Sequence, residues 1–148
     1  MSIIIKNIIT IAILLWAFSL FAQVNNETIK GVLAIKDNIL YLNDRVVYPK
    51  IEGDFSLTII ENFTYKNGNA ILLMNSSGGT ACPALYRLIM LSPSYIKQTP
   101  EFGNCSDLPK VAIVGSKLKL TFPMFKSAQK SIYIYDGSQL IENGRQLD

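Results

Sequence analysis

Short runs of β-forming residues, separated by turn signals, constrain the fold of this chain more than any other feature. The clearest run is 117–122, in which Leu118, Leu120 and Phe122 alternate with lysine and threonine. A period of two is typical of a strand with one buried and one solvated face. Turn pairs such as Asn67-Gly68 separate neighbouring runs, as tight hairpins require. The pattern predicts an all-β fold with antiparallel strands and little helix.

The other runs predict further strands along the whole chain. Their ranges are 28–35, 39–42, 46–48, 55–60, 70–74, 85–91, 131–135 and 140–141. The alternative for 85–91 is a short helix, but Pro83 and Pro93 limit its length and favour a strand. No internal repeat is evident from the residues. We therefore expect one continuous β-rich domain over 23–148, built as a single antiparallel sandwich or barrel.

Residues 1–22 are typical of an export signal. Lys6 precedes an apolar stretch that ends at the small Ala22, before the polar Gln23. This pattern predicts a signal peptide over 1–22 and a periplasmic mature chain over 23–148, which is long enough to bury one core. The alternative is an uncleaved N-terminal helix that anchors the protein, because the uncharged stretch 7–26 approaches the length that spans a bilayer.

Cys82 and Cys105 are the two cysteines of the sequence. Two cysteines in an exported domain typically form one disulfide, so we expect a bridge between them. The sequence contains no histidine, which excludes Ser-His-Asp and Cys-His catalysis and the histidine metal sites. We expect neither a metal nor a cofactor.

The charge balance argues against one class of partner and points to another. A net charge of +3 is too small for a general nucleic-acid binder, so we expect no nucleic acid. No acidic residue lies between Asp107 and Asp136, whereas the lysines there form a candidate basic face: Lys110, Lys117, Lys119, Lys126 and Lys130. Such a face suits an anionic envelope component. The alternative is that these lysines line the wet side of strands and protect an edge.

Paired carboxylates are the remaining route to catalysis, because two of them can act as general acid and base. The candidates are Glu52, Asp54, Glu61, Glu101, Asp107 and Asp136. Nothing in their spacing brings two together, so a carboxylate-dependent hydrolase is a third hypothesis, behind two binding functions.

Two segments around the cysteines resemble those of a group of small, uncharacterised exported proteins of proteobacteria. They are GGTACPALYR at 78–87 and the FGxCSDLP-like stretch within 101–109. The resemblance is confined to 78–109. It implies a periplasmic location and paired cysteines, and it carries no activity with it.

A bridge between these segments holds two loops together as a rigid surface, which favours binding. We expect seven exposed positions to lie in or near a recognition surface, namely Ser77, Gly78, Gly79, Tyr86, Arg87, Phe102 and Asp107. The predicted function is binding without catalysis, by an inhibitor or immunity-type protein that acts on a cell-envelope enzyme, with a periplasmic protein as partner. The alternative is an envelope-associated structural or accessory subunit that contacts lipid or peptidoglycan through the basic face.

Overall fold

The computed structural model describes residues 24–124 and 128–147, so the predicted signal peptide lies outside the described residues. The described chain contains thirteen strands and no helix. Every pairing between strands is antiparallel, and the strands belong to three sheets. In these ranges no helix is long and apolar enough to cross a bilayer.

The three sheets follow one another along the sequence, and each is built from consecutive strands. The N-terminal sheet has the order β1 (Glu27–Thr28), β2 (Gly31–Lys36), β3 (Ile39–Leu42) and β4 (Arg45–Val46). The central sheet has the order β5 (Ser56–Tyr65), β6 (Gly68–Ser76), β7 (Leu85–Leu91) and β8 (Ile96–Gln98). The C-terminal sheet has β9 (Lys110–Val114), β10 (Lys117–Pro123), β11 (Lys130–Tyr135), β12 (Leu140–Glu142) and β13 (Arg145–Gln146).

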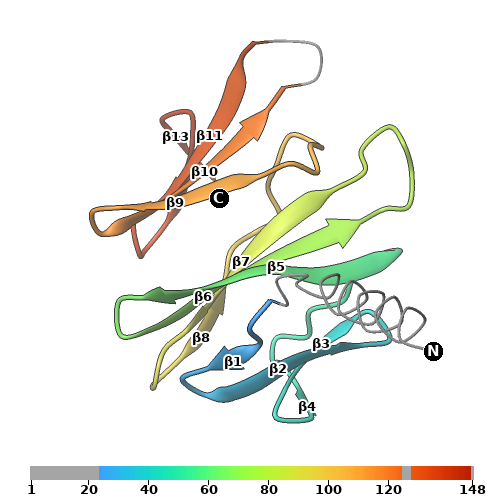
Figure 1. The fold of residues 1–148 in the computed structure, drawn as a ribbon, viewed down its shortest axis with the longest axis vertical. Helices are drawn as coiled ribbons and strands as arrows, with labels where there is room; N and C mark the ends of the chain where they lie inside the picture. The colour runs from blue at the N-terminus through green and yellow to red at the C-terminus, as the bar shows by residue number, and fades with distance from the viewer. Residues whose placement is uncertain (1–23, 125–127, 148) are drawn as a thin grey trace, which may run out of the picture.

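The sheets are stacked in three layers, with the C-terminal sheet above and the N-terminal sheet below the central one in Figure 1. The prediction of an all-β antiparallel fold with one disulfide is confirmed. Of the two predicted architectures the sandwich is correct, because each sheet of the described chain ends in two edge strands and none closes into a barrel. The sandwich has three layers, since the middle sheet is covered on both faces.

Strand β6 shows why the central sheet must be covered twice. Leu72 belongs to the core shared with the C-terminal sheet, whereas its neighbours Ile71 and Leu73 belong to the core shared with the N-terminal sheet. All three side chains are at most 1% exposed. Successive side chains of a strand point to opposite faces, so a strand this uniformly apolar is stable only between two layers.

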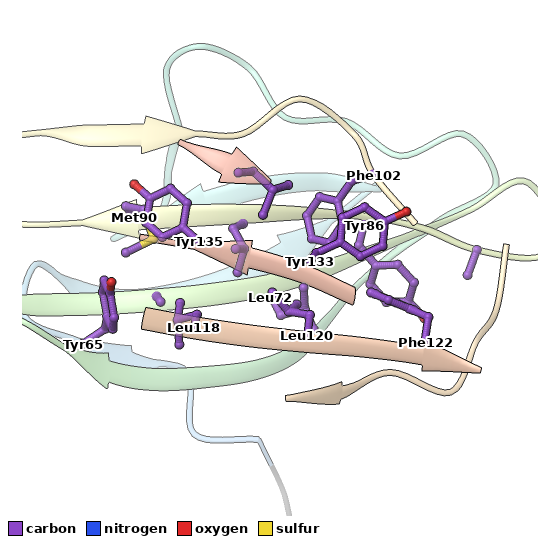
Figure 2. Close-up of a cluster of buried hydrophobic side chains, with 14 residues drawn as sticks. Tyr65, Leu72, Tyr86, Met90, Phe102, Leu118, Leu120, Phe122, Tyr133 and Tyr135 are labelled. Carbon is purple, nitrogen blue, oxygen red and sulfur yellow. The ribbon is translucent and has the colours of Figure 1, made fainter. Parts of the chain in front are cut away.

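Aromatic side chains fill one end of the core between the central and C-terminal sheets (Figure 2). The Tyr86 and Phe122 rings lie 4.9 Å apart between centroids, and Phe102 and Tyr133 lie 5.1 Å apart. Tilted and edge-on contacts at these distances are the favoured arrangement of aromatic pairs. These rings join two sheets that share no hydrogen-bonded strand pair.

The two outer sheets contain the same three-stranded unit, at 31–47 and at 131–147. Leu33 pairs with Leu42 in the first unit, and Tyr133 pairs with Glu142 in the second, each 100 positions later. The backbone therefore repeats a unit that is not evident from the residues. Only three of the seventeen aligned positions are identical, so comparing the two sequences does not reveal the repeated backbone.

Candidate functional site

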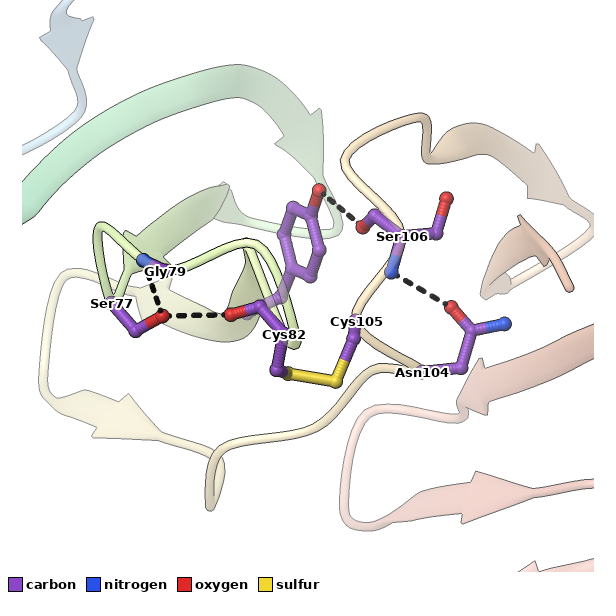
Figure 3. Close-up of a disulfide and its surroundings, with 7 residues drawn as sticks. Ser77, Gly79, Cys82, Asn104, Cys105 and Ser106 are labelled. Carbon is purple, nitrogen blue, oxygen red and sulfur yellow. Dashed lines mark hydrogen bonds between the residues drawn. A yellow bond between two sulfur atoms is a disulfide. The ribbon is translucent and has the colours of Figure 1, made fainter. Parts of the chain in front are cut away.

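The disulfide between Cys82 and Cys105 joins the loop before β7 to the loop that leads to β9 (Figure 3). The two Cα atoms are 4.6 Å apart. Just before Cys105, Phe102 forms a backbone bridge to Tyr86, with N···O distances of 2.8 and 2.9 Å in the two directions. This bridge continues the sheet pairing beside β7 and brings the two cysteines together.

Hydrogen bonds within each loop fix both loops in place. The Ser77 hydroxyl donates to the carbonyl of Cys82 at 2.8 Å, and the Gly79 N–H donates to Ser77 Oγ at 3.3 Å. On the other side of the bridge, the Ser106 N–H donates to Asn104 Oδ1 at 3.2 Å. The contacts drawn in Figure 3 therefore order the loops without any ligand.

Tyr86 ties the second loop to the core. Its ring is fully buried, and its hydroxyl donates to the carbonyl of Ser106 at 3.0 Å. Burial, and secondarily the negative charge of Asp107, raise the pKa of Tyr86 to about 12. The hydroxyl therefore keeps its proton at neutral pH and remains a donor to the loop.

A cavity of about 670 Å³ lies beside the disulfide. Its lining is mostly apolar and carries one charged residue, Asp107. The lining residues are Thr80, Ala81, Pro83, Asn104, Cys105, Ser106, Asp107, Leu108, Pro123 and Met124. Its volume lies within the range of small-molecule pockets, about 300–1,000 Å³. We call these residues, together with Ser77, Gly78 and Gly79, the clamped-loop site.

Four of the predicted recognition residues lie at exposed positions near the disulfide, namely Ser77, Gly78, Gly79 and Asp107. Tyr86 and Phe102 do not, and the expectation of exposed side chains at these two positions is wrong. Tyr86 lies in the same alternating row of β7 as Leu88, which faces the C-terminal sheet, and Phe102 packs beside it at 4% exposure. The buried side chains of Tyr86 and Phe102 therefore support the two loops from the core.

Arg87 lies away from the cavity, on the other face of β7. Its Nε is 3.5 Å from Glu101 Oε1, and its Nη1 donates to Gln98 Oε1 at 3.3 Å. Strand alternation gives the reason, because Arg87 and Tyr86 are neighbours and must point to opposite faces. Arg87 therefore belongs to a polar cluster that is separate from the clamped-loop site.

Two of the candidate carboxylates meet in that polar cluster. The amide nitrogen of Asn75 donates to Asp54 Oδ2 at 3.0 Å and to Glu101 Oε1 at 2.8 Å, and Asn75 Oδ1 accepts from the Asp54 N–H. Asn75 is nearly buried, so both carboxylates are held by a side chain that needs hydrogen-bond partners itself. Neither carboxylate lines the cavity at the disulfide.

The other candidate carboxylates are dispersed. Glu52 pairs with Lys50 at 2.5 Å, Glu61 is exposed on β5, and Asp107 lines the cavity. Asp136 Oδ1 accepts backbone N–H bonds from Ser138 and Gln139, which together with the Ser138 hydroxyl lower the pKa of Asp136 to about 2. That carboxylate caps a turn, and its position gives no indication of catalysis.

The predicted basic face lies on the outer side of the C-terminal sheet. Lys117 and Lys119 alternate along β10 with the buried Leu118, so they face away from the core. Lys110 is opposite Thr121 on the same side, and Lys130 is opposite Pro123 at the end of the sheet. Lys126 lies outside the described residues.

Sequence reasoning missed several exposed apolar side chains around the clamped-loop site. Leu108 and Met124 border the cavity and are 66% and 40% exposed. Phe55 is 70% exposed, and Gly78 lies so close to its ring that a Cβ on Gly78 would lie 2.8 Å from it. Phe55 was predicted as the first residue of a strand but precedes β5, and Leu108 lies in a loop, so only the structure reveals that they are uncovered.

No protein-family model, no curated protein and no solved structure matches this chain. The described ranges also contain no group of three or more cysteine, aspartate or glutamate side chains close enough to hold a metal ion. The candidate site is therefore argued from the geometry of the described residues alone.

Proposed function

We propose that this chain is a binding protein without catalytic activity, and that it recognises a protein partner through the clamped-loop site. The observation that carries the proposal is the cavity beside the disulfide, together with its uncovered apolar border at Leu108 and Met124. Interfaces depend on a few apolar anchors that fill such pockets. The partner we expect presents one large apolar side chain to the cavity and a basic side chain to Asp107.

Order in the unbound loops supports this function. The disulfide, the Ser77 bonds and the Tyr86–Ser106 bond hold the loops in one arrangement. Ordering a loop on binding costs roughly 0.5–1.5 kcal/mol for each immobilised side chain, and a preformed loop avoids much of that cost. Rigid, disulfide-linked loops suit a protein that occupies the cleft of an enzyme.

The cellular setting of the proposal is the periplasm. The signal-like residues 1–22 and the disulfide support it, because disulfides persist in oxidising compartments. Within that setting we propose an inhibitor or immunity-type protein that acts on a cell-envelope enzyme. The absence of histidine from the sequence supports binding over hydrolysis.

Site-specific photo-crosslinking in the producing cell tests this function. A crosslinking residue at Leu108 should give one adduct of defined mass, and the same residue at Val46 is the matched control. Val46 is also exposed and apolar but lies on the N-terminal sheet. Adding the Asp107→Lys substitution to the protein with the crosslinking residue at 108 should abolish the adduct without lowering the amount of folded protein.

Two results would overturn the proposal. One is the same set of adducts from positions 108 and 46, which would indicate unspecific contact. The other is an adduct at 108 that persists at full yield in the Asp107→Lys variant, because the predicted charge pairing would then be absent.

A further inference from the structure

The β9–β10 hairpin presents uncovered aliphatic side chains at its tip. Ile113 and Val114 are 51% and 57% exposed, although they are neighbours that point to opposite faces of β9. Val114 is opposite Lys117 on the uncovered outer face, whereas Ile113 is on the inner face but lies on β9, the edge strand of its sheet. A Cβ built on Gly115, in the turn, meets no atom within 4 Å.

The tip is held rigidly in spite of its exposure. The hydroxyl of Tyr65, at the end of β5, donates to the carbonyl of Ser116 at 2.6 Å. Tyr65 is itself 5% exposed and belongs to the core between the central and C-terminal sheets. The hairpin is therefore anchored to the central sheet while its aliphatic side chains remain in solvent.

Lysines and isoleucines occupy the outer face that continues from this tip. Lys119 is opposite Ala112 on one side and Ile134 on the other, and Ile134 is opposite Ile141. In the next row Thr121 lies between Lys110 and Ile132. Cationic side chains at β9 and β10 thus border a row of aliphatic ones at β11 and β12.

The cations of this face have little internal compensation. One carboxylate, Asp136, borders the face near Lys117, and its Oδ1 already accepts bonds from Ser138 and Gln139. The sequence supplies no other acidic residue between Asp107 and Asp136, and Glu142 of β12 is on the inner face, where it accepts a hydrogen bond from the Tyr133 hydroxyl. The described part of the face therefore carries a net positive charge that an anionic partner would neutralise.

We propose that the β9–β10 hairpin and the outer face of the C-terminal sheet dock onto a lipid bilayer that contains anionic phospholipids. Val114, on the same face as Lys117, and Ile113, at the exposed edge of β9, enter the interfacial region, and Lys110, Lys117, Lys119 and Lys130 meet lipid phosphates. The combination of exposed aliphatic residues with surrounding lysines favours a bilayer as the partner. A soluble polyanion would interact with the lysines alone. This surface is distinct from the clamped-loop site and does not depend on its function.

Vesicle co-sedimentation tests the docking surface. The full chain, in the form recovered from the producing cell, is mixed with phosphatidylcholine vesicles with and without phosphatidylglycerol, at low and high salt. Binding should require phosphatidylglycerol and weaken with salt, since lysine–phosphate attraction is screened. Lys117→Glu with Lys119→Glu should weaken it at least about tenfold, because each surface lysine contributes about 1 kcal/mol.

Three further variants test which residues the binding depends on. Ile113→Ser with Val114→Ser should also reduce binding severalfold while leaving its salt dependence intact. Arg45→Glu with Lys50→Glu carries the same change in charge on the N-terminal side and should bind as the unchanged protein does. Lys117→Gln with Lys119→Gln is the milder substitution if charge reversal lowers the yield of folded protein.

Three outcomes would overturn the docking proposal. The first is equal binding to vesicles with and without phosphatidylglycerol, or binding that neither salt nor the lysine substitutions change. An apolar anchor at the N-terminus would give that result. The second is an equal loss in the Arg45 and Lys50 control. The third is binding to soluble polyphosphate with the same affinity as to vesicles, which the Ile113 and Val114 substitutions do not change.

Discussion

Asn43 and Asn143 perform the same structural task in two different sheets, 100 positions apart. Asn43 donates its N–H to the carbonyl of Val32, and its Oδ1 accepts from the Val32 N–H, both at 2.9 Å. Asn143 makes the same pair of bonds with Ile132, at 2.8 and 3.0 Å. Both asparagines have positive φ, 51° and 45°, a conformation that asparagine tolerates better than most residues.

Asn143→Ala should lower the free energy of unfolding by about 2 kcal/mol, from the lost side-chain bond and from strain at positive φ. Asn143→Gly removes the bond and relieves the strain, so its cost should be about 1 kcal/mol. Urea unfolding measures both, and Asn43 should show the same ranking. Equal stability of the alanine and glycine variants would contradict the assigned strain.

Ile71→Ala and Leu72→Ala should each cost about 2–5 kcal/mol, although these residues are neighbours on one strand. The reason is that β6 is buried on both faces by different sheets. Thr58→Ala, at an exposed position of β5, is the control and should change stability by about 0.5 kcal/mol or less. A small effect at either core position in chemical denaturation would argue against the three-layer arrangement.

Replacing Cys82 and Cys105 together by serine should lower stability by about 3 kcal/mol, because the bridge closes a separation of 23 residues in the unfolded chain. Reduction of the unchanged protein should shift its urea midpoint in the same direction. The double variant should no longer respond to reductant. A midpoint that reductant leaves in place would show that the bridge contributes little.

The stability of the protein should fall as pH rises from about 10 towards 12, because Tyr86 is buried with its proton. Burial raises the pKa of Tyr86 from about 10 in the unfolded chain to about 12 in the folded state. Its contribution to the free energy of unfolding is therefore complete below about pH 10 and is lost as the pH rises towards 12. Tyr86→Phe cannot ionise and should make this fall less steep. Urea midpoints at pH 8, 10 and 11 measure the slopes, and identical slopes for the two proteins would rule out this role.

Local pattern was sufficient to predict several strands. The predicted ranges 39–42 and 85–91 coincide with β3 and β7, and 117–122 matches β10 to within one residue. β5 was predicted to end at 60 but continues to Tyr65, because a bulge between Ile59 and Glu61 shifts the alternation on which the prediction relied. The candidate site was predicted only in part, since exposure at Tyr86 and Phe102 depends on which face of β7 another sheet covers.

The sequence by itself determined the strand-forming segments, their antiparallel hairpins and the pairing of Cys82 with Cys105. These properties depend on local alternation, on turn residues and on the presence of only two cysteines. The tertiary structure decided that the sandwich has three layers, that units 31–47 and 131–147 repeat, and which residues surround the cavity. Those outcomes depend on contacts between segments far apart in the chain, where burial is set by the partner layer and by the tyrosine and phenylalanine side chains that fill the space between sheets.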